Sequence, residues 1–191
     1  MNNNNENEYY QRRKNHKYYK YIRFLLSMLA RETDSICDVG SNGVDVISFL
    51  PCREMTSIDI ANPFSSEKVK GIVGDFLSYP LPQYNIITCF QVLEHISDEK
   101  VHVFADRLLE LGDIAVISVP FMWEKGYCLE HVQDPIDIKK FLGWFSVPPV
   151  FTHKIIEENG RARLVAVFIN ANMTEKLYAL SDIEPRDIFC I

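Results

Sequence analysis

Three aspartates lie at the ends of three apolar, strand-like segments in the first half of the chain. They are Asp38, Asp59 and Asp75. Where parallel strands of one sheet end side by side, such carboxylates can accept hydrogen bonds from the amino and hydroxyl groups of a shared ligand. They attract a cation and repel a diphosphate. The pattern therefore indicates a site for a positively charged nucleoside.

A glycine turn directly after the first aspartate gives a ligand close access to the backbone. Its residues are Gly40, Ser41, Asn42 and Gly43. The chain lacks the G-x-G-x-x-G pattern expected of a nicotinamide-binding turn. Asp59 follows the turn by about twenty residues, the usual spacing for an acid that binds ribose hydroxyls. Asp75 and Phe76 suit the adenine amino group and ring.

The elements that must position these residues alternate between strands and helices from residue 35 onward. Apolar runs predict parallel strands buried on both faces, at 35–40, 54–60, 69–75, 84–90 and 113–120. Helical spacing of apolar residues predicts helices at 8–31, 44–50, 97–111 and 135–144. Right-handed crossovers then give an α/β fold with a doubly wound, mostly parallel seven-stranded sheet.

The sequence near the C-terminus predicts an antiparallel pair of strands at one edge of that sheet. Asn159-Gly160 separates two β-rich runs, 149–158 and 161–170. Asn-Gly predicts a tight hairpin in which both turn residues have positive φ.

Upstream of these strands, Asp134-Pro135 is typical of a helix N-cap followed by proline in the first turn.

Composition places the protein among ordinary globular chains. It has 191 residues, 47% hydrophobic and 24% charged, with a net charge of −6. We expect residues 1–7 to be disordered, 8–34 to form an N-terminal helix, 35–171 to form one domain, and 172–191 to be a tail. Residues 1–31 are basic and the remainder is acidic, which disfavours nucleic acid as a partner.

The same sequence also indicates where the protein is located and whether it binds a metal. No apolar run is long enough for a membrane span, and the Asn-rich and basic N-terminal residues lack the apolar stretch of a secretory signal, so we do not expect export. The five scattered cysteines predict a cytoplasmic protein and no metal site with zinc spacing. The oligomeric state stays open, and a homo-oligomer is compatible with the sequence.

The segments DVGSNG, SIDI, GDF, NIITCFQVLEHISD and IAVISVP together resemble the class I S-adenosylmethionine-dependent methyltransferases, in particular a subgroup with VLEH after the fourth strand. The resemblance covers about residues 35–120 and implies a Rossmann-like fold with S-adenosyl-L-methionine as cofactor. It implies that the methionine part is held by Asp38, Gly40, Ser41, Asn42, Gly43 and Gln91, and the nucleoside by Asp59, Ile60, Asp75 and Phe76.

The same resemblance places the methyl acceptor against the segment after the fifth strand. Candidate acceptor-binding residues are Glu94, Trp123, Tyr127 and His131. His131 and His95 are candidate general bases, because the pKa of histidine lies near neutral pH; each could equally be structural. Tyr9, Tyr10, Tyr18 and Tyr19 make the N-terminal helix either a lid over the site or a helix packed on the sheet.

We expect an enzyme that methylates O or N of a small molecule, such as a sugar or another pathway metabolite. The alternative is a catalytically inactive relative that binds the cofactor or a protein partner. A nicotinamide oxidoreductase is disfavoured by Asp38 and the missing glycine pattern. A nucleic-acid base methyltransferase is disfavoured by the sequence CFQV at 89–92, where an Asn/Asp-Pro-Pro-Tyr run would be expected.

Overall fold

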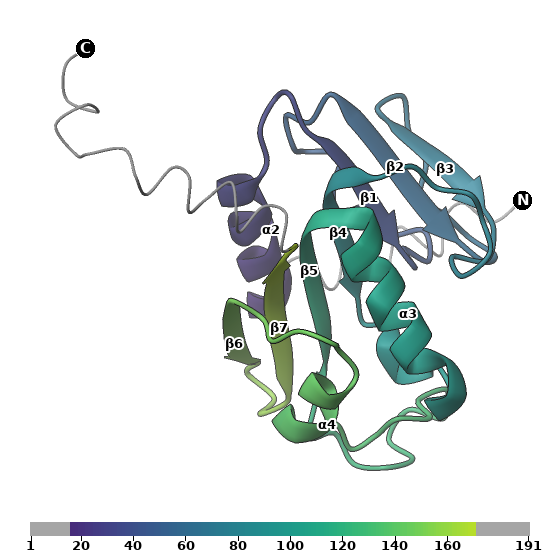
Figure 1. Ribbon diagram of the computed structural model, residues 1–191. Coiled ribbons are helices and arrows are strands. Elements are labelled where there is room, and N and C mark those ends of the chain that lie inside the picture. The colour runs from purple at the N-terminus through teal and green to yellow at the C-terminus, as the bar shows by residue number, and fades with distance from the viewer. Residues whose placement is uncertain (1–15, 171–191) are drawn as a thin grey trace, which may run out of the picture.

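A seven-stranded sheet forms the centre of the described part of the molecule, and Figure 1 shows its arrangement. The computed structural model describes residues 16–170, so the predictions for residues 1–7, for Tyr9 and Tyr10 and for 172–191 lie outside it. The elements are α2 (Lys17–Leu29), β1 (Ser35–Val39), β2 (Glu54–Asp59), β3 (Val69–Val73), β4 (Tyr84–Phe90), η1 (Leu93–His95), α3 (Asp98–Leu111), β5 (Gly112–Phe121), α4 (Ile138–Gly143), β6 (Phe151–Ile156) and β7 (Ala162–Ile169).

The strand order is β3-β2-β1-β4-β5-β7-β6. Strands β1 to β5 pair in parallel, whereas β7 is antiparallel to both β5 and β6. The predicted fold class, a mostly parallel sheet with an antiparallel C-terminal pair, is confirmed. The order reverses between β1 and β4, and the crevice at such a switch point is where open α/β sheets bind ligands.

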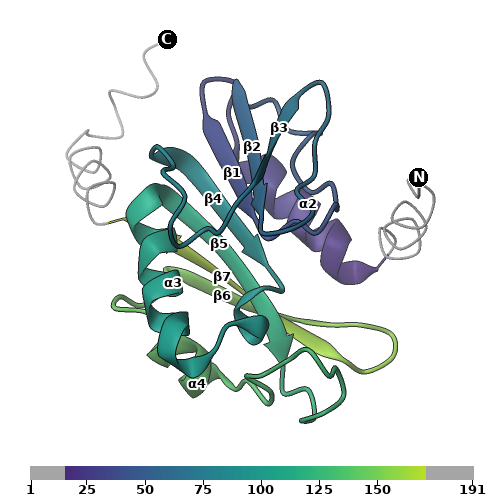
Figure 2. The same cartoon turned by 90° about the vertical axis from the view of Figure 1, so that its right-hand side faces the viewer.

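Helices cover the two faces of the sheet unequally (Figure 2). One face packs on α3 and α4, and the other packs on α2. Strand β1 is buried along its whole length because it lies at the centre, with apolar side chains from both layers against it. None of the helices in the described part has the length and apolar content that a bilayer span needs.

The predicted helix at 44–50 is wrong, because this segment consists of turns and bends. The Asp45 carboxylate accepts hydrogen bonds from Ile47 N and Ser48 N, at 3.3 and 2.9 Å. Such side-chain bonds compete with helical backbone bonds, and the β-branched residues of the segment favour a helix only weakly. The apolar side chains Val46, Ile47 and Leu50 are still buried, which explains the helix-like spacing.

The C-terminal hairpin forms as predicted but with a different turn. Gly160 has φ +79°, whereas Asn159 does not have a positive φ. Gly160 N donates to Glu157 O at 2.9 Å, and Glu157 N donates to Arg161 O at 2.8 Å. A longer loop with one left-handed glycine therefore replaces the predicted two-residue turn.

The predicted helices near the site differ at their ends. Helix α3 spans Asp98–Leu111, close to the predicted 97–111, whereas α4 is shorter than the predicted 135–144. The cap of α4 is Asp137, whose side chain accepts from Lys140 N at 2.6 Å. The prediction that Asp134 is the cap is therefore wrong, and its carboxylate forms a hydrogen bond with His131 Nδ1 instead.

Candidate functional site

A pocket of about 220 Å³ opens at the carboxyl ends of β1 and β4, at the switch point of the sheet. Its walls come from the glycine turn, the η1 segment, the loop after β5, the first turn of α2 and one side chain of β7. The predicted site residues that it brings together are Asp38, Gly40, Ser41, Asn42, Gln91, Glu94, His95, Trp123 and His131. Those that lie outside its lining are Gly43, Asp59, Ile60, Asp75, Phe76 and Tyr127.

Asp38 is the most buried aspartate of the predicted cofactor site. Its side chain is 3% exposed and accepts one hydrogen bond from Thr88 Oγ1, at 2.6 Å. Burial raises the pKa of Asp38 to about 7, and the hydrogen bond from Thr88 opposes this shift. A cation in the pocket would stabilise the ionised carboxylate.

The glycine turn has a backbone that only glycine can follow at its first position. Gly40 has φ +75°, and a Cβ added there would lie 2.5 Å from Val92 Cγ2. Asn42 also has a positive φ, +46°, which asparagine tolerates better than most residues. Ser41 Oγ fixes the turn by accepting from Phe64 N at 2.8 Å.

Asp59 holds two loops together at the end of β2. Its carboxylate accepts from Asn42 N, Ala61 N and Asn62 N, each at 2.9 Å. It thereby ties the glycine turn to the following loop. Next to it, the side chain of Ile60 is 75% exposed, so an apolar surface faces solvent beside the acid.

Asp75 and Phe76 are separated by the structure. Asp75 is exposed and accepts from Leu77 N at 2.9 Å. Phe76 is 5% exposed, and its ring lies 4.7 Å from that of Phe104 in the core. Of the two, only Asp75 offers an accessible group to a nucleoside.

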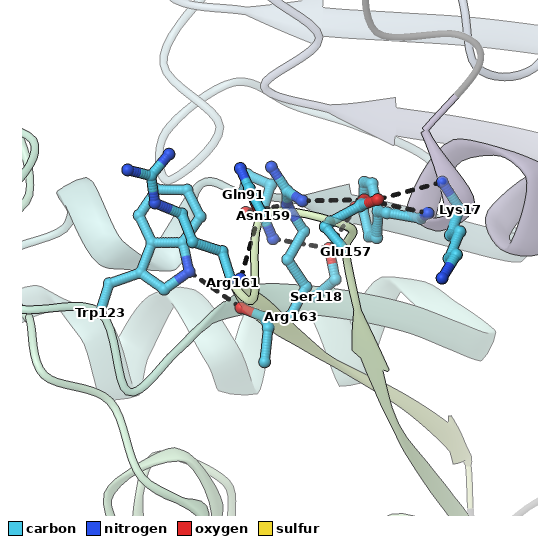
Figure 3. A network of polar contacts seen from close by, with 10 residues as sticks. Lys17, Gln91, Ser118, Trp123, Glu157, Asn159, Arg161 and Arg163 are labelled. Atoms are coloured by element: carbon cyan, nitrogen blue, oxygen red, sulfur yellow. Dashed lines mark hydrogen bonds and ion pairs between the residues drawn. The ribbon is translucent and has the colours of Figure 1, made fainter.

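Gln91 joins the pocket to a buried polar network (Figure 3). It has φ +58°, and its Oε1 accepts from Arg163 Nε at 3.1 Å. Arg163 Nη1 in turn donates to Glu157 Oε1 at 3.1 Å, and both side chains are 7% exposed. Glu157 accepts from the backbone N–H groups of Lys17 and Tyr18 at 3.1 Å. The first turn of α2 is thus anchored by an acid of the distant hairpin.

The sequence reasoning did not single out Arg163 and Glu157. Arg163 lines the pocket, and a charged residue in the apolar run RARLVAVFIN was the available signal. On α2, Tyr18 is 2% exposed, and its hydroxyl and Ser118 Oγ share a hydrogen bond of 2.5 Å. Tyr18 and Tyr19 both line the pocket, and whether α2 moves as a lid stays a prediction.

An acid and two histidines meet at the acceptor end of the pocket. Glu94 is 1% exposed, and burial raises its pKa to about 8. His131 Nδ1 lies 2.6 Å from Asp134 Oδ2, and His95 Nδ1 lies 3.1 Å from Glu130 O. Burial lowers the pKa of His95, which favours its neutral form.

Aromatic rings line the neighbouring wall. The ring centroid of Trp123 lies 5.4 Å from that of Tyr127 and 5.7 Å from that of His131. Trp123 Nε1 donates to Ala162 O at 2.9 Å, which fixes the indole. Arg161 lies over the Tyr127 ring at 3.7 Å. Three of the four predicted acceptor-binding residues, Trp123, Tyr127 and His131, therefore form one wall, although Tyr127 lines an adjoining pocket.

Comparison with solved structures identifies the fold. N-methyltransferase NodS from Bradyrhizobium japonicum WM9, in complex with S-adenosyl-L-homocysteine, matches with a TM-score of 0.61 and 14% identity, over 81% of this chain and 86% of that one. The 1,6-didemethyltoxoflavin-N1-methyltransferase of Burkholderia thailandensis, with 1,6-didemethyltoxoflavin and S-adenosylhomocysteine bound, matches with a TM-score of 0.65 and 11% identity, over 86% of each chain.

Magnesium protoporphyrin IX methyltransferase from Synechocystis PCC 6803, with S-adenosylmethionine bound, matches with a TM-score of 0.57 and 14% identity, over 81% of this chain and 80% of that one. No protein-family model and no curated protein sequence matches the chain. At these identities the comparisons show the fold alone. The chain has the Rossmann-like fold of class I methyltransferases, and membership in the VLEH subgroup stays a prediction.

Proposed function

We propose that this protein transfers a methyl group from S-adenosyl-L-methionine to a small-molecule acceptor. The observation that carries the proposal is the buried carboxylate of Asp38 beside the left-handed Gly40 turn, in a pocket at the switch point of this fold. A carboxylate 3% exposed with its pKa raised to about 7 is only partly ionised at neutral pH, and a cation beside it favours the ionised form. An amino-acid ammonium group meets that need.

The residues present fit this cofactor. Asp38 would bind the ammonium group, and the backbone at Gly40, which lines the pocket, would approach the methionine part. At the other end, Asp59 would accept from ribose hydroxyls with the lone pairs that its backbone donors leave. Exposed Ile60 would cover one face of the adenine and Asp75 would accept from its amino group.

When bound, S-adenosyl-L-methionine supplies a methyl group already activated by the sulfonium. The chain's own residues must then orient the acceptor, which can supply on the order of 7–11 kcal/mol of the barrier. For a hydroxyl acceptor, His131 or His95 is the predicted base. The Asp134 carboxylate, 2.6 Å from His131 Nδ1, would keep that ring in one tautomer.

The acceptor is proposed to be a small molecule that packs on Trp123 and Tyr127. The 1,6-didemethyltoxoflavin and magnesium protoporphyrin IX methyltransferases, which share the fold, are named for compounds of this size class. A cytoplasmic location is proposed from the cysteine pattern.

Calorimetric titration with S-adenosyl-L-methionine and with its demethylated product tests the proposal. We expect both to bind the full chain, and Asp38→Asn to weaken binding on the order of tenfold. The matched control is Asp98→Asn, an exposed acid of α3 that is not among the residues lining the pocket, which should leave affinity unchanged. If neither compound binds, or if NADH binds in their place, the proposal is wrong.

Turnover is a separate measurement, because an inactive relative would bind the cofactor and transfer nothing. Methyl-labelled cofactor with a panel of hydroxyl and amine acceptors provides it. We expect His131→Ala to lower turnover much more than cofactor affinity. An equal loss in both would contradict the assignment of His131 as the base, and binding without turnover on any acceptor would favour the inactive alternative.

A further inference from the structure

Three possible metal ligands converge at the acceptor end of the pocket, outside the predicted cofactor-binding residues. Glu94 and His95 come from the η1 turn, and His131 comes from the loop after β5. One ligand atom from each lies within 4.8 Å of those from the other two. This spacing lets a single ion touch all three, although they come from segments far apart in the sequence.

Glu94 is the member of this cluster that most needs a partner. Its side chain is 1% exposed, yet neither carboxylate oxygen has a hydrogen-bond partner among the residues that the structure describes. Buried polar atoms are nearly always paired, because an unpaired one pays the full cost of leaving water. Half-buried Asp59 and exposed Asp75, by contrast, accept hydrogen bonds from backbone N–H groups of their own loops. Glu94 is therefore placed for a cationic ligand.

Both histidines are oriented from behind by an acceptor. His131 Nδ1 lies 2.6 Å from the carboxylate of Asp134, whose side chain is fully buried, and His95 Nδ1 lies 3.1 Å from Glu130 O. Each Nδ1 therefore carries the proton and donates it, which leaves Nε2 with its lone pair. Metal-binding histidines show this arrangement, in which an outer carboxylate or carbonyl fixes the ring and its tautomer.

We propose that Glu94, His95 and His131 bind one divalent transition-metal ion, which faces the pocket. Two imidazoles and one carboxylate suit Mn²⁺, Co²⁺ or Zn²⁺, whereas Mg²⁺ and Ca²⁺ prefer sites made of oxygen alone. Three protein ligands leave further coordination positions open for an acceptor or water. Arg163 also lines the pocket, but its guanidinium is engaged by Gln91 and Glu157 and does not neutralise Glu94 directly.

The ion's role in methyl transfer rests on the proposed function. It would bind a hydroxyl of the acceptor and lower the pKa of that hydroxyl, so that the proton leaves to solvent. The resulting oxygen forms the new O–CH₃ bond while the S–CH₃ bond breaks and sulfur keeps its electron pair. A histidine whose Nε2 binds an ion cannot accept this proton. The inference therefore replaces His95 and His131 as bases and favours an oxygen acceptor over nitrogen.

The test is metal binding itself, without cofactor or acceptor. The full chain is treated with EDTA and dialysed. One sample is then titrated with MnCl₂, and free Mn²⁺ is measured by electron paramagnetic resonance. A second sample is titrated with CoCl₂, and bound Co²⁺ is measured by visible absorption. We expect one equivalent to bind per chain. Glu94→Gln should weaken binding at least on the order of a hundredfold, and Asp134→Asn on the order of tenfold, since it acts only through His131.

The matched control is His102→Gln, an exposed histidine on α3, which should bind as the natural chain does. Glu94→Gln should also melt no lower than the natural chain without metal, because it removes an unpaired buried carboxylate. No metal bound by the natural chain, or equal binding in Glu94→Gln, would overturn the inference. If the chain binds no metal but still binds the demethylated cofactor, only the metal site is contradicted and the proposed function stands. If the chain binds metal but not the cofactor, only the proposed function is contradicted.

Discussion

The two halves of the sheet differ in the burial and in the hydrogen-bond partners of their acidic side chains. In the β1–β3 half, the connections between strands contain no helix in the described chain, and the acids Asp59 and Asp75 accept from backbone N–H groups of their own loops. In the β4–β7 half, helices cover the sheet and three acids, Glu94, Asp134 and Glu157, are buried. Glu94 has no hydrogen-bond partner among the described residues, and Glu157 is paired with Arg163.

The difference separates two tasks of the proposed site. An acid near solvent that is held by its own loop costs little and can offer spare lone pairs to hydroxyl groups. An acid buried without a donor costs stability, and it attracts a cation strongly because the surroundings screen charge poorly. We infer that the first half provides the shape and the hydrogen bonds that bind a nucleoside. The second half provides buried acids that attract a cation near the methyl group to be transferred. Asp38, buried on β1, lies at the boundary between them.

The largest effect is expected from breaking the buried ion pair of the second half. Arg163→Met leaves Glu157 charged and 7% exposed without its guanidinium, so the free energy of unfolding should fall by about 3 kcal/mol. The control is Arg161→Met, which removes a guanidinium stacked over Tyr127 and should cost less than about 1 kcal/mol. Urea denaturation measures both. Equal losses would mean that burial does not distinguish the two arginines.

Next in size is the effect of closing the glycine turn of the first half. Gly40→Ala combines a positive φ with a Cβ 2.5 Å from Val92 Cγ2, so it should cost about 2 kcal/mol of stability. Affinity for the demethylated cofactor should fall on the order of tenfold. Gly143→Ala is the control, because a Cβ there meets nothing within 4 Å. Undiminished affinity in Gly40→Ala would show that the ligand does not approach this turn.

The boundary residue Asp38 should make cofactor binding depend on pH. Its pKa is raised to about 7, so at pH 6 the carboxyl is mostly protonated and binds an ammonium group poorly. Affinity should be about fivefold lower at pH 6 than at pH 7, by the ratio of ionised fractions. Calorimetry at both pH values checks this, and Asp38→Asn should remove the dependence. A pH effect that persists in Asp38→Asn would assign it to another group.

The raised pKa of Asp38 affects folding stability in the opposite direction: cofactor affinity should rise with pH, whereas stability should fall. Between about pH 4 and pH 7 the folded chain holds a proton on Asp38 that the unfolded chain releases, so folding stability should fall as pH rises through this window. Above pH 7 this contribution is constant. Thermal melting of the natural chain and of Asp38→Asn, without ligand, should therefore diverge with rising pH.

The sequence predicted well those features that depend on neighbouring residues. Buried strands appear as apolar runs, so all seven strands were found, and the amphipathic spacing of 97–111 predicted α3. The helix expected at 44–50 failed because Asp45 bonds to backbone N–H groups two and three residues further on, an arrangement that spacing does not reveal. The aspartate expected to cap α4 instead supports His131.

The site was predicted in part for a related reason. Strand ends are local, so Asp38 and the glycine turn could be placed at the pocket from the order of strands alone. Contacts between distant segments could not: Arg163 reaches Gln91 across 72 positions of the chain, and Glu157 reaches the start of α2 across about 140. The meeting of Glu94 with His131 is of the same kind, and no sequence spacing for zinc describes it.

The smallest effect tests whether the acids of the first half bind the cofactor with the lone pairs that their backbone donors leave free. Asp75→Asn keeps a side-chain oxygen that can accept from Leu77 N, so stability should change by less than about 0.5 kcal/mol. Losing one charged acceptor at an exposed position should weaken cofactor binding only about threefold, since water competes there. Asp38→Asn, from the buried boundary, should weaken it several times more. If the two substitutions proved equal in calorimetry, burial would not set the strength of these carboxylates, and the contrast between the two halves would fail.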